Sequence, residues 1–454
     1  MTSTSGQPRA TALAPEEGPG GDAPENLVGT PPEEPPSEQE IAGIAAPARS
    51  GLLSVFRHRN YRLFFTGQFV SLMGSWMQNT AQPWLVYDLT HSKLLLGVVS
   101  FCSTIPVFFI TPFGGMVADR VDRRKFLLVT QSAAMIQAAV LAALTLLHMI
   151  QVWEIVCLAL TMGLINAFDV PTRQSMTLDM VGREDLRHAI SLNSMMFNAA
   201  RLGGPPLAGL LIWLAGEGIC FALNAASFAA VLGSLILMRL GERPPRVNTH
   251  ALREIADGYR YSFITPQIRL SLLLVALSSL FGAAYLTMIT AIVRELLQGS
   301  SLAQGLLMGA IGLGALGGAF ALSRISERQL AYAPALAAMV FGASLVAFSH
   351  SHLLWLSVVL VLPVSASLML LGGTTNTIIQ TVAEERFRGR VISHYTQCFM
   401  GMMPWGALLL GALSERFGVT DAISFGGLAV LLSATAAFFW RRASGFSLAH
   451  APAE

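Results

Sequence analysis

Charged side chains are scarce in this sequence. Asp, Glu, Lys and Arg account for 12% of its 454 residues, whereas hydrophobic residues account for 53% and the mean hydropathy is +0.56. A soluble globular protein carries about 25% charged residues, so we expect most of this chain to lie in lipid. The net charge is +2, and no single basic face is available for binding nucleic acid.

The sequence has only four cysteines, and it contains no nucleotide-binding motif. The four cysteines all lie inside apolar runs and share no spacing pattern, so we predict neither a disulfide nor a metal site. The sequence has no glycine-rich loop with the lysine that binds nucleotide phosphates. Nor do Ser, His and Asp occur together where a nucleophile could work in water. We therefore predict no cofactor, no use of ATP and no enzymatic reaction.

Long apolar runs occupy most of the chain from residue 61 onward. A helix of roughly 20 apolar residues crosses the hydrocarbon core of a bilayer, and twelve runs pass this test. They lie near 61–87, 94–118, 126–148, 153–176, 189–214, 219–239, 268–293, 303–323, 330–349, 354–380, 391–414 and 421–440. The sequence therefore predicts an all-α membrane protein with twelve transmembrane helices.

Lys and Arg outside these spans are divided unequally between the two sides of the predicted membrane. From residue 49 onward, with those at the ends of spans included, one side holds 23 of them and the other holds only Lys93, Arg294 and Arg416; both termini lie on the richer side. Connections rich in Lys and Arg stay in the cytoplasm. Both termini are therefore predicted to be cytoplasmic.

Composition divides the chain into five parts. Residues 1–50 are rich in Pro, Gly, Glu, Ser and Thr and hold almost no large apolar side chains, which predicts a disordered tail. The longest connection has apolar residues at helical spacing beside charged ones, which predicts an amphipathic helix on the membrane surface; the alternative is a solvated linker. The predicted parts are a cytoplasmic tail (1–50), a six-helix bundle (51–239), a cytoplasmic linker (240–267), a second six-helix bundle (268–442) and a short cytoplasmic tail (443–454).

The two predicted bundles are related in sequence. Segment 174–211 aligns without gaps on 376–413, at an offset of 202 residues. In this alignment Gly204 matches Gly406, and Gly209 matches Gly411. The match supports a duplicated six-helix unit in parallel orientation.

The most informative stretch is Gly114–Lys125, GGMVADRVDRRK. It joins two apolar runs by a short charged turn, so the two helices must be antiparallel neighbours, and its basic residues place the turn in the cytoplasm. The small-residue pair followed by D-R-x-D-R-R-K resembles the signature loop of the major facilitator superfamily. The resemblance implies two pseudo-symmetric six-helix bundles that give alternating access to a cavity between them.

The same resemblance implies a cytoplasmic gate built around this loop. We expect the loop to pair with the turn at 386–390, or with the neighbouring Glu384 and Glu385. The predicted gate residues are Gly115, Asp119, Arg120, Asp122, Arg123, Arg124, Lys125, Arg173, Arg386, Arg388 and Arg390.

Three charged residues stand out within the spans of the first predicted bundle, namely Asp169, Arg173 and Arg201, and each is therefore a candidate functional residue. Asp169 lies about 12 Å from the cytoplasmic end of its helix and Arg201 about 18 Å, at 1.5 Å per residue. Asp169 could pair with Arg201 on the next helix, or with Arg173 four residues further along its own helix. Asp169 is either a proton-coupling residue or part of a latch with Asp119 and Arg173. Family resemblance favours the latch, whereas the depth of Arg201 favours a place in the cavity.

Polar residues on other spans complete the predicted substrate and coupling site. Amide side chains can line a cavity, although they also hold helices together. The predicted set is Asn79, Gln82, Asp169, Arg201 and Asn224.

The segment RLGGPPLAG (201–209) combines a proline pair with closely spaced glycines. It resembles the glycine–proline motif of the antiporter branch of the superfamily. The alternative is close helix packing around a proline kink. Its candidate residues are Gly203, Gly204, Pro205, Pro206 and Gly209.

Three further stretches narrow the resemblance. The segment beginning RNYRLFFTGQFVSLMGSWMQNTAQPWLVYDLT, together with NAFDVPTRQ and GREDLRHAISLNS, is similar to a bacterial exporter group that includes enterobactin and macrolide or multidrug exporters. The resemblance implies a monomeric, proton-driven secondary transporter in the bacterial inner membrane that exports a bulky organic solute. The alternatives are a lipid flippase of the same fold and a non-transporting membrane sensor or scaffold.

Overall fold

The computed structural model describes residues 52–239 and 260–443, except for the side chains of residues 112–116 and 118–120. The predicted tail 1–50, most of the predicted linker 240–267 and residues 444–454 lie outside this range. The described residues contain helices and no strand, which agrees with the predicted all-α class.

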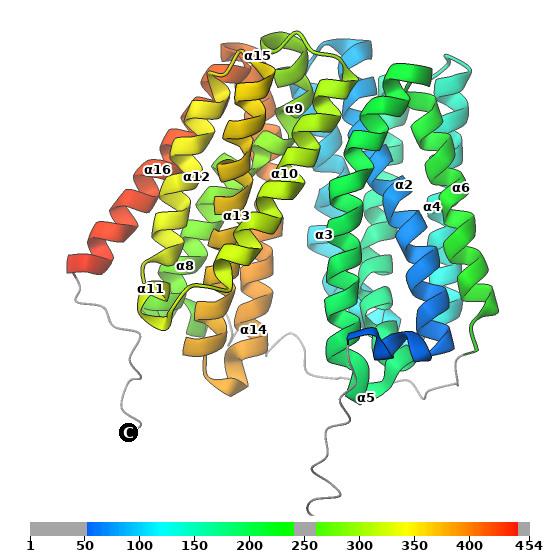
Figure 1. Ribbon diagram of the computed structural model, residues 1–454, viewed down its shortest axis with the longest axis horizontal. Helices are drawn as coiled ribbons and strands as arrows, with labels where there is room; N and C mark the ends of the chain where they lie inside the picture. The colour runs from blue at the N-terminus through cyan, green and yellow to red at the C-terminus, as the bar shows by residue number, and fades with distance from the viewer. Residues whose placement is uncertain (1–51, 240–259, 444–454) are drawn as a thin grey trace, which may run out of the picture. The chain divides into compact units, whose positions relative to one another are not determined.

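The first half of the described chain consists of long helices that run alternately up and down (Figure 1). A short 3₁₀ helix precedes them. The elements are η1 (Leu52–Arg57), α2 (Arg59–Thr90), α3 (Lys93–Arg120), α4 (Arg123–Leu146), α5 (Val152–Ala215) and α6 (Glu217–Leu237).

The second half is more irregular. Its first rod consists of α8 (Pro266–Leu277), η2 (Ser278–Gly282), η3 (Ala283–Met288), α9 (Ile289–Ala291) and η4 (Ile292–Leu296). It continues with α10 (Ser301–Leu322), α11 (Glu327–Leu330), α12 (Ala333–Ser349), α13 (Leu354–Val382), α14 (Glu385–Thr396), η5 (Gln397–Gly401), α15 (Met403–Phe417) and α16 (Val419–Ala443).

The predicted spans all fall largely on helical residues. Among the described residues, nine helical segments are long and apolar enough to cross a membrane, and α12 is a shorter apolar helix. Helix α5 counts once in that number but holds two predicted spans, 153–176 and 189–214. The number of twelve crossings stays a prediction.

Gly182 divides α5 into two antiparallel rods. Its backbone has φ 72° and ψ −176°, a region that is open almost exclusively to glycine. The chain therefore reverses direction here, and the second rod returns beside the first. The carboxylate of Asp185 next to this turn binds Ser54 Oγ at 2.9 Å and His58 Nε2 at 2.8 Å, which fastens η1 to the turn.

The outer surface of the helices is apolar. Large side chains such as Val129, Phe320, Phe425 and Leu432 are more than half exposed. A monomer in water rarely exposes so much contiguous apolar surface. Lipid is therefore the environment that suits these helices.

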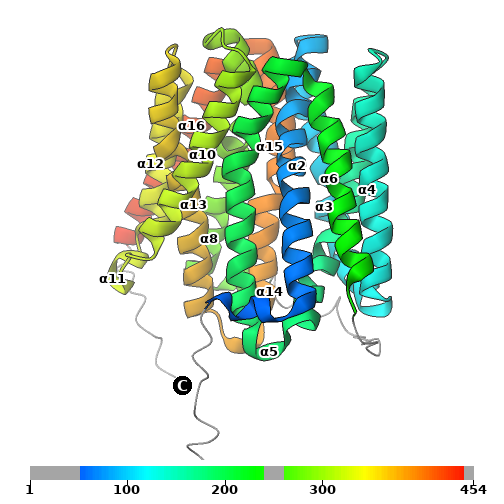
Figure 2. The ribbon, with the colours of Figure 1, turned by 45° about the vertical axis from the view of Figure 1, so that its right-hand side comes forward.

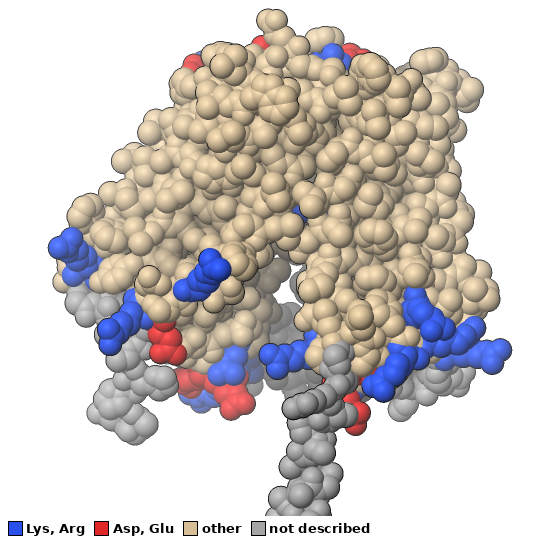
Figure 3. Space-filling model, in the orientation of Figure 1, with Lys and Arg blue, Asp and Glu red and all other residues tan. Residues whose placement is uncertain are grey.

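The two halves touch mainly through two pairs of helices, α5 with α10 and α3 with α15. Figure 2 shows α10 beside α5 from a second angle. Lys and Arg gather at one end of the molecule, where a hollow separates the halves (Figure 3). We call this the basic end and the other the opposite end.

Candidate functional site: a cavity between the two halves

A cavity of about 480 Å³ lies between the halves. Its polar lining comes mostly from α2, α3, α4 and α5, whereas the second half contributes Leu286, Thr287, Met308, Ile311 and Met403. All five residues of the predicted substrate and coupling set are part of the wall: Asn79, Gln82, Asp169, Arg201 and Asn224. Their roles in binding and coupling stay predictions.

Asp169 is buried at the first-half wall of the cavity, with 3% of its surface exposed. Its Oδ1 atom accepts hydrogen bonds from Thr130 Oγ1 at 2.8 Å and Gln131 Nε2 at 2.7 Å, both on α4. Its Oδ2 atom lies 3.7 Å from the guanidinium of Arg173. Of the two partners considered for Asp169, the structure therefore shows Arg173, and every contact stays within the first half.

Asn224 belongs to a chain of amides that links four helical segments. It donates to Gln78 Oε1 at 2.8 Å, Gln78 donates to Gln137 Oε1 at 3.3 Å, and Gln137 donates to the carbonyl of Leu158 at 3.2 Å. Asn224 has no exposed surface although it forms part of the wall. In this conformation its amide holds α2 and α6 together. Holding helices together is the second role, besides lining a cavity, that amide side chains have in membrane proteins.

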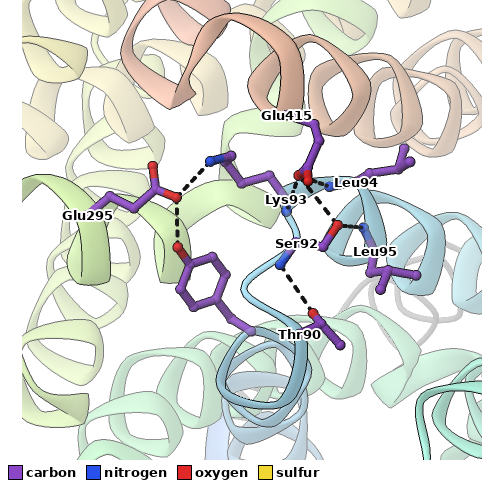
Figure 4. Close-up of polar contacts among 8 residues, drawn as sticks. Thr90, Ser92, Lys93, Leu94, Leu95, Glu295 and Glu415 are labelled. Atoms are coloured by element: carbon purple, nitrogen blue, oxygen red, sulfur yellow. Dashed lines mark hydrogen bonds and ion pairs between the residues drawn. The ribbon is translucent and has the colours of Figure 1, made fainter.

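The halves are also joined by polar contacts at the opposite end (Figure 4). Glu295 on η4 accepts hydrogen bonds from Tyr87 Oη at 2.6 Å and Lys93 Nζ at 2.8 Å. Glu415 on α15 accepts from the backbone amides of Lys93 at 2.7 Å and Leu94 at 3.2 Å, so it caps α3 from the other half. This is a favourable place for a carboxylate, because the amides at a helix N-terminus lack intrahelical partners.

A second cross-half pair lies close by. Arg294 bonds to the carboxylate of Asp88, and its guanidinium stacks over the ring of Trp84 at 4.0 Å. We call Tyr87, Asp88, Lys93, Arg294, Glu295 and Glu415 the opposite-end network. This network was not predicted from the sequence. The adjacent Arg–Glu and Glu–Arg pairs at 294–295 and 415–416, each at the end of an apolar run, were the signal that could have revealed it.

The contacts that the structure describes for the predicted gate at the basic end lie within one half or the other. Asp122 accepts from the backbone amides of Arg124 and Lys125 and so caps α4. Arg123 pairs with Asp179 at 2.8 Å. Arg124 donates to the carbonyls of residues 235 and 236 at the end of α6.

On the other side of the hollow, Arg386 pairs with Glu384 at 2.8 Å, and both Arg386 and Arg390 lie over the ring of Phe387. Arg388 is exposed. The described contacts do not include the expected pairing of the 119–125 loop with this turn, and that pairing stays a prediction. The side chains of Asp119 and Arg120, and the surroundings of Gly115, lie outside the description.

A cavity that is reached from one end and closed at the other is the arrangement of a transporter. The family model described as transmembrane secretion effector, a branch of the major facilitator superfamily, matches residues 50–453. The chain belongs to this family.

Relatives of this transporter agree with that assignment. The staphyloferrin A transporter of Staphylococcus aureus is 25% identical over 84% of this chain and 96% of its own. The multidrug efflux pump Tap of Mycolicibacterium fortuitum is 26% identical over 84% and 95%. The enterobactin exporter EntS of Shigella boydii is 25% identical over 83% and 90%.

Solved structures show the same fold. A bacterial homologue of the human lysosomal transporter Spinster superimposes with a TM-score of 0.67 at 13% identity, covering 88% of this chain and 99% of its own. The fold is therefore that of the major facilitator superfamily, and the protein is a membrane transporter and not an enzyme.

The glycine–proline segment lets α5 approach two neighbours in this transporter. A Cβ atom on Gly204 would lie 2.5 Å from Cβ of Trp76 on α2, and one on Gly209 would lie 2.5 Å from the carbonyl oxygen of Ser301 on α10. Gly203 faces the end of Met73 at 3.4 Å, and the helix continues through Pro205 and Pro206. Close packing thus accounts for the glycines, and a link to antiport stays a prediction.

Proposed function

We propose that the protein is a secondary active exporter that moves a bulky organic solute out of a bacterial cell by alternating access, driven by the proton gradient. The observation that carries this proposal is a cavity that is hollowed toward the basic end while the opposite-end network joins the halves. The relatives, which are named as siderophore or multidrug transporters, support this class of solute.

The distribution of Lys and Arg supports the direction of transport. Cytoplasmic connections of membrane proteins are rich in these residues, and they gather at the end where the hollow opens (Figure 3). We infer that the basic end and both termini face the cytoplasm of a cell with the protein in its inner membrane. The conformation is then ready to take up a solute from inside, and a single chain supplies the whole cavity.

We propose Asp169 as the residue that carries the coupling proton. Among the residues that line the cavity in the described part, it is the only carboxylate. A latch must join groups that separate during transport, whereas the described partners of Asp169 all lie on α4 and α5. Its carboxylate is held by hydrogen bonds from Thr130 and Gln131 on α4, and it lines the cavity that the solute would enter.

Proton movement in reconstituted vesicles tests the proposal. Vesicles with an imposed pH gradient are given a panel of siderophores and amphipathic drugs, and the internal pH is recorded for wild type, Asp169→Asn and the matched surface control Glu184→Gln. We expect solute-dependent proton flux in wild type and the control, and none in Asp169→Asn. Flux that persists in Asp169→Asn would remove Asp169 from coupling, and absence of flux with every solute would contradict proton-driven export.

A further inference from the structure

The cavity wall carries one positive charge that no counter-ion balances. Its charged residues, within the described part of the chain, are Asp169, Arg173 and Arg201. Asp169 and Arg173 lie 3.7 Å apart and neutralise each other. Arg201 makes no hydrogen bond and no ion pair with any described residue, although it lies on the same wall.

Arg201 lies at a depth where an unpaired charge is costly. It is on α5 in the rod that follows Gly182, half-buried, with Gly204 and Pro205 one turn further along. A guanidinium in a low-dielectric site needs a partner, because desolvation penalises its charge.

The other half places an unused hydroxyl near this charge. Tyr285 on η3 is 1% exposed, and its Oη atom has no hydrogen-bond partner in the described structure. Its phenol interacts electrostatically with Arg201. The next two residues, Leu286 and Thr287, line the cavity. A cation from one half and a free hydroxyl from the other are thus available in the same region.

The rest of the second-half wall is apolar and adaptable. It consists of Leu286, Met308, Ile311 and Met403, with Thr287 as its one hydroxyl. Methionine is flexible and polarizable, so it adjusts to apolar groups of different shape. The cavity therefore has a cationic, amide-rich side and an apolar side.

We propose that the solute is an amphipathic organic anion, whose carboxylate or similar acidic group pairs with Arg201 while its apolar body lies against the methionine-containing wall. This rests on the proposed transport function and specifies its substrate class. A guanidinium forms two parallel hydrogen bonds with a carboxylate, which adds geometric selectivity to charge attraction. A neutral or cationic solute of the same shape would leave Arg201 unpaired.

Binding to the purified full-length protein in detergent tests the charge preference without requiring transport. Three fluorescent probes share one apolar group and differ in charge: dansyl-phenylalanine (anionic), its primary amide (neutral) and dansylcadaverine (cationic). We expect wild type to bind the anion about tenfold to a hundredfold more tightly than the amide, the range for hydrogen bonds to a charged group. The cation should bind most weakly.

Variants identify the residue responsible. Arg201→Gln should remove the preference for the anion while it still binds the amide, and Arg201→Lys should restore part of the preference. Arg62→Gln, an exposed arginine at the basic end, is the matched control and should behave as wild type. Each variant is compared with wild type by size-exclusion chromatography and thermal unfolding, so that misfolding is recognised.

Several results would overturn this inference. They are equal or tighter binding of the amide or the cation by wild type, a preference for the anion that survives in Arg201→Gln, and binding of none of the three probes. The outcome is separable from that of the export proposal. Anion binding without proton-driven transport would refute export alone, whereas proton-driven transport of cations would refute the anion preference alone.

Discussion

The opposite-end network should set the balance between the conformation seen here and one that opens at the other end. Glu295 is its central acceptor, with charge-assisted bonds to Tyr87 and Lys93 at 2.6 and 2.8 Å. Glu295→Gln keeps the size of the side chain but removes its charge. Two hydrogen bonds between the halves are thereby weakened.

The size of the effect follows from the exposure of the pair. A hydrogen bond to a charged group contributes about 1.5–3 kcal/mol, but exposed ion pairs contribute only about 0–1 kcal/mol. The side chains of Lys93 and Glu295 are 16% and 31% exposed, so we take an intermediate total of about 1–3 kcal/mol. That shifts the conformational equilibrium about 5- to 150-fold away from the state closed at the opposite end.

Distances between spin labels can measure this shift. Labels at Met149→Cys and His352→Cys lie on exposed loop residues of the first and second half at the opposite end, in a protein whose four native cysteines are replaced by serine. Glu295→Gln should add or enlarge a population with a longer distance. Asp421→Asn, an exposed carboxylate at the same end, should leave the distribution unchanged. An unchanged distribution in Glu295→Gln would show that the network does not hold the halves together.

Two predictions concern the turn that divides α5. Gly182→Ala places a Cβ atom at φ 72° and should cost about 1–3 kcal/mol of stability, seen as a lower unfolding temperature; Gly233→Ala, with open space around it, is the control that should not lose stability. The hydrogen bonds from His58 and then Ser54 lower the pKa of Asp185, so this carboxylate stabilises the fold at neutral pH and loses its contribution as pH falls below the ordinary aspartate value of about 3.9. The protection of the Leu52–Arg57 amides against hydrogen exchange, taken relative to their intrinsic rates at each pH, should therefore fall at acidic pH in wild type and already at neutral pH in Asp185→Asn. Equal protection in both proteins at neutral pH would contradict this role.

Sequence reasoning located the helices and the cavity wall because both depend on local chemistry. A run of apolar residues long enough to cross lipid has few alternatives to a helix. A polar residue within such a run must find a polar environment, which is why Asn79, Gln82, Asp169 and Arg201 all lie on the cavity wall. Asn224 follows the same rule, although it is fully buried in the amide chain.

The sequence did not allow us to predict which residues form contacts between the two halves. Glu295 and Lys93 are 202 residues apart, and nothing in either local pattern determines which residue of the other half each will meet. The gate pairing expected at the basic end stays a prediction for a related reason. A transporter alternates between conformations, and a sequence motif does not state which of them a structure shows.

The internal repeat predicts more than a duplicated fold, because its matched glycines have equivalent places in the structure. A Cβ atom on Gly209 of α5 would lie 3.0 Å from Cα of Gly305 on α10, and one on Gly411 of α15 would lie 3.3 Å from Cα of Gly97 on α3. Each half therefore contributes one helix to each close contact, and both contacts lie toward the opposite end.

These glycine contacts differ physically from the polar ones beside them. Backbones that meet without interlocking side chains gain dispersion energy over a small area, so they can separate without pulling large side chains out of pockets. Charge-assisted bonds such as Glu295–Lys93 are stronger and directional. We therefore expect the opposite-end network to hold that end closed, while the glycine contacts allow the halves to part once it is broken.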